Sequence, residues 1–385
     1  MRKLVLIILF LLILSPSIAL AQEYEYDPEY DSEYDYYQDD SMVPIHSKGQ
    51  VLEIIDEELD IDIGGGLKVA HQTLKVKITN GPFKDQVITT ENSTSGNVAY
   101  DMWLVEGDKV LLYLETTEDG ELVEGYVMDF VRDTYLLAII AIFILVLIIV
   151  GKMKGLKSVF TLGFTLLIIG KFLLPLLFKG YNPVLLALLS GFIIATVTFL
   201  VVAGRGKKSI AAILGTTGGL LTAVLISIII GKMANLRGLS GEEAQMLMYI
   251  PQEIQFNFQG LLFAGIMIGA LGAVMDVSIS IASAMEEIKN VGNKLNFREM
   301  FKSGMNVGKD IMGTMSNTLI LAYTGTSIPL LLLLMAYDEP ISKLINMEFL
   351  ATEVIRALSG SIGLILSIPI TAFIAAILMN TNNKS

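Results

Sequence analysis

The stretch GIMIGALGAVMDVSISIASAMEEI, residues 265–288, is apolar enough to cross a bilayer, yet it carries an aspartate, serines and three glycines. Its small and polar residues follow one another in steps of three or four, which keeps them on one face of an α-helix. They are Gly265, Gly269, Gly272, Asp276, Ser280, Ser283 and Glu287. The opposite face is apolar enough to face lipid. The stretch therefore predicts a transmembrane helix with one polar face, which either packs against other helices or lines a path.

The composition is that of a multispanning membrane protein. Of the 385 residues, 53% are hydrophobic and 17% are charged, a balance too apolar for an ordinary soluble domain. The chain has no cysteine, which excludes disulfides, thiolate metal sites and cysteine nucleophiles. Its two histidines, His46 and His71, lie outside the apolar segments, so a histidine relay through the membrane is also excluded. We expect no metal and no cofactor.

The N-terminus, MRKLVLIILFLLILSPSIALAQ (1–22), has the layout of a secretory signal peptide. A charged start precedes an apolar run, and residues 19–21 form a small-x-small cleavage site. We expect cleavage after Ala21, with an uncleaved anchor helix as the alternative. In both cases the residues that follow are delivered outside the cytoplasm.

The part of the chain that follows the signal is strongly acidic. Residues 22–132 hold 26 acidic against 7 basic residues, whereas residues 133–385 hold 13 acidic against 18 basic ones. This excess of negative charge disfavours nucleic acid as a partner, because binding it requires positive charge. Residues 22–43 are rich in Asp, Glu and Tyr with hardly any aliphatic side chain, so we expect a disordered tether.

Residues 44–132 show short alternating apolar runs separated by Gly, Asn and Asp turns. The runs are GQVLEII, QTLKVKIT, DQVITTEN, DKVLLYL and EGYVMDF. Five short strands in so few residues predict a small extracytoplasmic β-barrel of the OB type. Because the domain lacks a basic, aromatic-lined face, we interpret it as a spacer or docking module and not as a nucleic-acid binder.

Seven apolar segments follow, each close to the roughly 20 residues that a helix needs to cross a bilayer. They lie at about 134–150, 158–178, 182–203, 209–231, 260–284, 311–336 and 354–378. If the β domain is outside, most Lys and Arg residues of the connecting loops fall in the cytoplasm, as the positive-inside rule requires. The sequence thus predicts an all-α membrane domain over 133–385, in the plasma membrane, with a cytoplasmic C-terminus.

Polar side chains inside two of these segments are candidates for function, because ionisable groups in a bilayer are costly and usually face a bundle interior or water. Carboxylate and carboxamide oxygens are ligands for a cation, and a carboxylate is also a proton site. We predict a polar pathway made of Asp276, Ser280, Ser283, Glu287, Asp310, Thr314 and Asn317. For Asp310 and Glu287, a solvated position at the membrane surface is the alternative.

Glycines within the segments have a simpler interpretation. Small residues at helical spacing let transmembrane helices approach closely, and glycine near a proline also permits a bend. We therefore assign packing or hinge roles to Gly265, Gly269, Gly272, Gly215, Gly218, Gly219 and Gly325.

Enzymatic functions find no support. The chain has no G-x-x-x-x-G-K-[ST] motif for nucleotide hydrolysis, and GRGKKS (204–209) fails that spacing. A serine–histidine hydrolase within the membrane needs a histidine that the apolar segments lack. The Gly-x-Gly-Asp motif of aspartyl intramembrane proteases is also absent from the sequence. We expect a protein that is not an enzyme.

The stretches GAVMDVSISIASAMEEI (272–288) and GKDIMGTMSNTLILAYTG (308–325) together resemble the YibE/F-like membrane proteins of bacteria. The similarity extends from the β domain to the last apolar segment, about 44–378, and leaves out the acidic tether. The resemblance implies a multispanning membrane protein and names no substrate.

Two functions remain open on this basis. The first is a secondary transporter or transport component for an ion or small solute, with Asp276 as the coupling-ion or proton site. The second is a non-transporting scaffold or sensor whose β domain binds a partner, while the polar stripe only joins helices. Expected partners are the lipid bilayer, an ion or small solute, and either further copies of the chain or another membrane protein.

Overall fold

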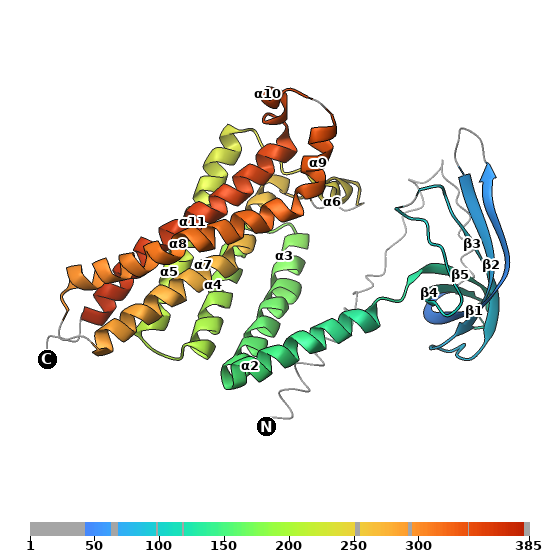
Figure 1. Ribbon diagram of the computed structural model, residues 1–385, viewed down its shortest axis with the longest axis horizontal. Helices are drawn as coiled ribbons and strands as arrows, with labels where there is room; N and C mark the ends of the chain where they lie inside the picture. Colours follow the sequence, from blue (N-terminus) through green and yellow to red (C-terminus); the bar gives the residue numbers. More distant parts are fainter. Residues whose placement is uncertain are drawn as a thin grey trace. The chain divides into compact units, whose positions relative to one another are not determined.

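The structure is a computed structural model that describes residues 43–62, 68–97, 99–117, 119–250, 255–291, 295–337 and 339–380. The expected signal peptide and nearly all of the acidic tether lie outside these residues. The chain divides into two compact units, one built around a β-sheet and one helical, with the boundary between Leu145 and Val146 (Figure 1). Each unit is described separately.

The β unit is a half-barrel of five antiparallel strands, which confirms the predicted strands. They are β1 (Val43–Asp62), β2 (Lys68–Ile78), β3 (Val87–Ser93), β4 (Lys109–Thr116) and β5 (Leu122–Phe130). Their order in the sheet is β3-β2-β1-β4-β5. The long strand β1 pairs with both β2 and β4, and irregularities of its register along β2 let it curve.

The two edges of this sheet approach each other. A Cβ atom built on Gly125 of β5 would lie 2.6 Å from Ile88 Cδ1 of β3, so a glycine is needed where the edges meet. Alternate residues point inward, as the alternating burial of β2 shows. The core consists of Val51, Leu74, Val76, Ile78, Phe83, Leu104, Val110, Leu112 and Leu114.

A buried polar network joins the segment before β4 to this core. Gln72, which is completely buried, donates from Nε2 to the Leu104 carbonyl at 3.0 Å. Its Oε1 accepts from the Leu104 amide and from Asn92 Nδ2, both at 3.1 Å. Asn92 also donates to the Met102 carbonyl at 2.9 Å. Buried polar groups satisfied in this way hold a segment in one place, because any alternative leaves them without partners.

We predict that Gln72→Ala destabilises the β unit by roughly 2–4 kcal/mol, because the change leaves several buried partners unsatisfied. The matched control is Gln50→Ala, whose side chain makes one exposed bond of 3.4 Å to the Gly107 carbonyl. Hydrogen exchange of β2 and β4 amides in the detergent-solubilised full chain measures the effect. Equal protection in the two variants would contradict it.

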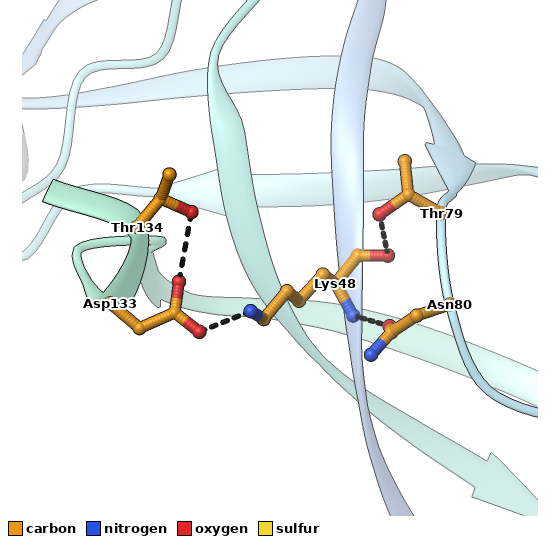
Figure 2. A network of polar contacts seen from close by, with 5 residues as sticks. All are labelled: Lys48, Thr79, Asn80, Asp133 and Thr134. Atoms are coloured by element: carbon orange, nitrogen blue, oxygen red, sulfur yellow. Dashed lines mark hydrogen bonds and ion pairs between the residues drawn. The ribbon is translucent and has the colours of Figure 1, made fainter. Parts of the chain in front are cut away.

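The β unit is tied to the start of helix α2 (Asp133–Ile168) through Lys48 of β1. Figure 2 shows Lys48 Nζ paired with the Asp133 carboxylate, which also accepts a hydrogen bond of 3.2 Å from the Thr134 hydroxyl. The Lys48 backbone is held in turn, since its amide donates to Asn80 Oδ1 at 2.5 Å and its carbonyl accepts from the Thr79 hydroxyl at 3.0 Å. The first turn of α2 is therefore fixed to the sheet.

The two residues between β5 and α2 add to this connection. Val131 is buried, and Arg132 donates to the Asp129 carboxylate at 2.5 Å while its guanidinium lies over the Phe130 ring. This hydrogen bond from Arg132 holds the pKa of Asp129 below its usual range. Because the linker has only two residues and its arginine is bound to Asp129, the start of α2 has little freedom to change its orientation relative to the sheet.

The helical unit contains the remaining elements, which Figure 1 labels. They are the π-helix η1 (Ile169–Leu173), α3 (Leu174–Phe178), α4 (Pro183–Val202), α5 (Lys207–Met233), α6 (Glu242–Met246), the 3-10 helix η2 (Leu247–Tyr249), α7 (Phe258–Val291), α8 (Phe297–Thr326), α9 (Ile328–Ala336), α10 (Ile341–Leu344) and α11 (Glu348–Asn380). Caps set some boundaries: Asn182 caps α4, and Asn296 with Glu299 forms a capping box at α8.

The described residues contain five helices long and apolar enough to cross a membrane, or six if α8 and α9 form one bent span. The prediction of seven spans was therefore wrong in number. The expected segments 134–150 and 158–178 lie in one helical run, Asp133–Phe178, which is broken at Lys152 (φ 49°, ψ −125°). A Cβ built on Gly155 would collide with the Leu147 carbonyl, so glycine permits this tight reversal.

The core of the helical unit is formed by α4, α5, α7, α8 and α11, which lie against one another in Figure 1. The most extensive contact joins α5 to α11. At their crossing, a Cβ on Gly219 would lie 2.9 Å from the Gly363 carbonyl oxygen, and one on Gly363 would lie 2.7 Å from the Gly219 oxygen. These two backbones are in direct contact, as small-xxx-small packing allows.

Candidate functional site

Helix α7 exposes its polar stripe and buries its apolar face. Gly265, Gly269, Gly272, Asp276, Ser280 and Glu287 are exposed, and Ser283 is half-buried. The opposite face, from Phe263 to Met285, lies in the bundle core against α4, α5, α8 and α11. The apolar face, which by its composition could have faced lipid, is the buried face in the structure. Among the described residues, most of the stripe is uncovered; the exceptions are Ser283 and Gly269, which Tyr323 of α8 approaches.

Asp276 lies near the middle of α7. Among the described residues, its side chain makes no hydrogen bond or ion pair. Glu286, one turn before the end of α7, differs because it pairs with Lys208 of α5 at 2.7 Å. A carboxylate without a partner in a helix apolar enough to span a membrane is costly in lipid.

On α8 the predicted polar residues are also exposed. Asp310, Thr314 and Asn317 share the outward face, and the Thr314 hydroxyl donates to the Ile311 carbonyl at 3.0 Å. The described residues show no hydrogen bond or ion pair between these side chains and Asp276. Asp276 and Asn317, both assigned to the predicted polar pathway, are therefore not joined by a direct side-chain contact among the described residues. Each helix presents its own polar face.

One side chain connects the two helices at the level of the glycines. Tyr323 of α8 places its hydroxyl against Gly269, where even a Cβ atom would collide with it. That hydroxyl is buried and has no hydrogen-bond partner among the described residues. Gly269 is thus required for the approach of Tyr323. Tyr323 lies close to the break between α8 and α9, and its side chain reaches from there to the stripe on α7.

The break between α8 and α9 borders a cavity of about 230 Å³. The two helices bend by 58° at Ser327, close to Gly325, to which a packing or hinge role was assigned from the sequence. Most of the cavity wall is apolar, and its polar groups come from Tyr323, Thr324, Ser327 and Glu353. The Ser327 hydroxyl lies 3.3 Å from Glu353 Oε2. Broken helices with freed backbone groups form substrate and ion sites in many transporters.

Glu353 and its partner Arg356 were not among the residues predicted from the sequence. They form an ion pair of 3.3 Å one turn apart on α11. The predicted last span began at residue 354 and so left Glu353 outside the membrane, whereas α11 begins at Glu348. An acid followed three residues later by a base at the start of an apolar segment was the available signal.

The predicted packing glycines fall into two groups. Gly215, Gly218 and Gly219 of α5 all lie against α11, and a Cβ on Gly215 would collide with Thr371. By contrast, a Cβ added at Gly265, Gly272 or Gly325 would meet nothing within 4 Å. The described residues contain no cluster of three or more acidic or histidine side chains suited to a metal ion.

These features define a class of protein: a membrane-embedded protein with a small β unit and a bundle of apolar helices. The sequence pattern of YibE/F-like proteins matches residues 139–381, and that of the YibE/F family N-terminal domain matches residues 45–130. The chain belongs to the YibE/F-like family. Comparisons with curated proteins and with solved structures gave no match.

Proposed function

We propose that this protein is a secondary transporter, or a transport component, for an ion or small solute. The observation that carries the proposal is the exposed, unpartnered carboxylate of Asp276 on a stripe of small and polar residues in α7. A polar stripe along a transmembrane helix is costly in lipid and useful along a water-filled path. Asp276 is the coupling-ion or proton site, and the protein is not an enzyme.

The break between α8 and α9 supports this proposal as the element that moves. Ser327 and Pro329 interrupt the helix, and Gly325 before them has open space around it. A discontinuous helix next to a cavity allows two packings of the same residues, which alternating access requires. Tyr323 lies between the cavity and the stripe, where a change at the break is transmitted to α7.

In this proposal the β unit lies outside the cytoplasm and the C-terminus inside, as the distribution of Lys and Arg indicates. The unit is OB-like: β1 pairs with β2 and β4, and Ile88 of β3 meets Gly125 of β5 where the sheet edges approach. Its acidic surface makes a nucleic-acid role unfavourable, so it serves as a spacer or docking module.

A scaffold or sensor is the second candidate, and the Lys48–Asp133 connection is the observation that favours it. Because the first turn of α2 is fixed to the sheet, a partner bound to the β unit would act directly on the first span. In this case the protein carries no substrate, and partner binding survives the loss of the Asp276 charge.

Charge movement in proteoliposomes distinguishes the two. Purified protein is tested with a panel of inorganic cations and small anions over a range of pH, beside the Asp276→Asn variant. A substrate-dependent current that the substitution abolishes supports transport. Well-folded wild-type protein with no current across the panel overturns the transporter and leaves the scaffold.

A further inference from the structure

The cavity beside the break between α8 and α9 combines a carboxylate with apolar walls. Glu353 of α11 borders the cavity, and its side chain is only 23% exposed. A carboxylate in apolar surroundings attracts a positive charge more strongly than one in water, because the local dielectric constant is low. Most of the remaining wall is aliphatic and comes from α8, α9 and α11: Ile320, Leu331, Leu350, Val354, Ala357 and Leu358.

Glu353 is held only loosely by its neighbours. Its Oε1 lies 3.3 Å from the Arg356 guanidinium, and its Oε2 lies 3.3 Å from the Ser327 hydroxyl. Charge-assisted hydrogen bonds from nitrogen are usually about 2.7–2.9 Å long. The Ser327 hydroxyl has a single proton and also lies 3.0 Å from the Tyr323 carbonyl oxygen, so it cannot donate fully to both acceptors. Glu353 Oε2 therefore keeps acceptor capacity next to Ser327, which also borders the cavity.

The volume of the cavity limits the molecule that it can hold. An apolar cavity of about 150 Å³ accommodates benzene, and a water molecule occupies about 30 Å³. The cavity beside the helix break measures about 230 Å³. It therefore has room for a group the size of a benzene ring together with about two or three further heavy atoms. A whole membrane lipid is much too large for it.

We propose that this cavity is the substrate site and that its ligand is a small primary amine with an apolar body. The ammonium group donates a hydrogen bond to Glu353 Oε2, and the apolar body lies against the aliphatic wall. Sites for small molecules combine an apolar lining with a few polar groups in this way. An inorganic cation would require several oxygen ligands, which a mostly aliphatic wall does not offer. The inference rests on the proposed transport function and names the class of solute that is carried.

Tyr323 connects this site to the proposed coupling site. It borders the cavity, and its hydroxyl lies against Gly269 of α7. Gly269 is on the same face of α7 as Asp276, about two helical turns away. A ligand that shifts Tyr323 therefore acts on the stripe without touching it.

Binding of radiolabelled phenethylamine to the full chain in nanodiscs tests the site. The nanodiscs contain phosphatidylcholine only, whose quaternary ammonium has no N–H to donate. Unlabelled phenethylamine should displace the label, 2-phenylethanol should compete at least tenfold more weakly because it lacks the charge, and phenylacetate should not compete. Equal competition by the amine and the alcohol, or no saturable binding above empty nanodiscs, would overturn the proposal.

Two variants, each with a matched control, locate the binding. Glu353→Gln should weaken phenethylamine binding at least tenfold, whereas Glu243→Gln should leave it unchanged, since Glu243 is an exposed acid on α6. Ala357→Leu fills part of the cavity and should abolish binding, whereas Ala322→Leu makes the same change at an exposed position of α8 outside the cavity wall. Thermal midpoints show which variants are folded, and the ligand series in the wild type needs no variant. Undiminished binding by folded Glu353→Gln would contradict the proposal.

Two further measurements separate the alternatives. Phosphatidylethanolamine carries the same ammonium group, so a loss of phenethylamine binding when this lipid is added would assign the cavity to a lipid headgroup and overturn the free solute. Phenethylamine also joins the substrate panel in proteoliposomes. Binding without any current overturns the transport function and retains the amine site. An ion current from protein that binds no amine overturns the amine site and retains the transport function.

Discussion

Gly219→Leu is expected to prevent the helical unit from folding. A Cβ at this position would lie 2.7 Å from Ser367 Cβ, 2.8 Å from Val274 Cγ1 and 2.9 Å from the Gly363 oxygen, and leucine adds three further carbons. One of these neighbours is backbone, so no change of side-chain rotamer relieves the collision. The crossing of α5 and α11 must separate, at a cost of about 3 kcal/mol or more.

The measurement is the yield of monodisperse protein after mild detergent extraction, together with its thermal midpoint. Gly170→Leu provides the control, because a Cβ at this position would meet nothing within 4 Å from other parts of the described chain. We expect near-normal yield from the control and little or none from Gly219→Leu. A Gly219→Leu protein as stable as the control would show that α5 and α11 do not cross at these glycines.

The second large effect is on transport. Asp276→Asn keeps the shape of the side chain and removes its charge, and no intrachain partner is lost with it. We therefore expect stability within about 0.5 kcal/mol of wild type and a substrate-dependent current reduced at least tenfold, because the ion or proton loses its ligand. Asp276→Glu should retain part of the current.

Glu243→Gln on α6 is the control for this substitution, since it removes an exposed acidic charge outside the stripe. Its current should equal that of wild type. A current that survives Asp276→Asn undiminished would exclude the carboxylate as the coupling site, whatever else carries the substrate.

The spacing of residues in the sequence predicted which residues share a face of α7, but it left open which face is buried. Steps of three and four residues place Gly272 and Asp276 on one side, and the structure keeps them there. Periodicity does not say which side meets the core, however, because lipid tails are as apolar as Leu or Ile. The apolar face around Met267 and Val274 is compatible with both lipid and a protein core. It lies in the core because four other helices pack against it.

Other differences have local causes. The basic stretch around Lys152 was interpreted as a loop between two spans, but the reversal is confined to that residue and depends on Gly155. Glu353 was missed because the predicted span was bounded by hydropathy, and this criterion leaves charged residues near the start of a helix outside the span. The strands could be predicted from the sequence because alternating apolar residues and turn residues are local signals. In the structure these strands form a sheet in which β1 pairs with β2 and β4.

The central claim is that the Asp276–Glu287 half of the stripe lines an aqueous path and does not face lipid. Its most direct test is the labelling of single cysteines in native membranes by a membrane-impermeant, water-requiring thiol reagent. The account predicts rapid labelling of Ser280→Cys, slowed by a transported ion, and almost no labelling of Leu225→Cys on α5, where the side chain is 55% exposed. Equal and slow labelling of both would contradict it, because the stripe would then be as dry as a lipid-facing surface.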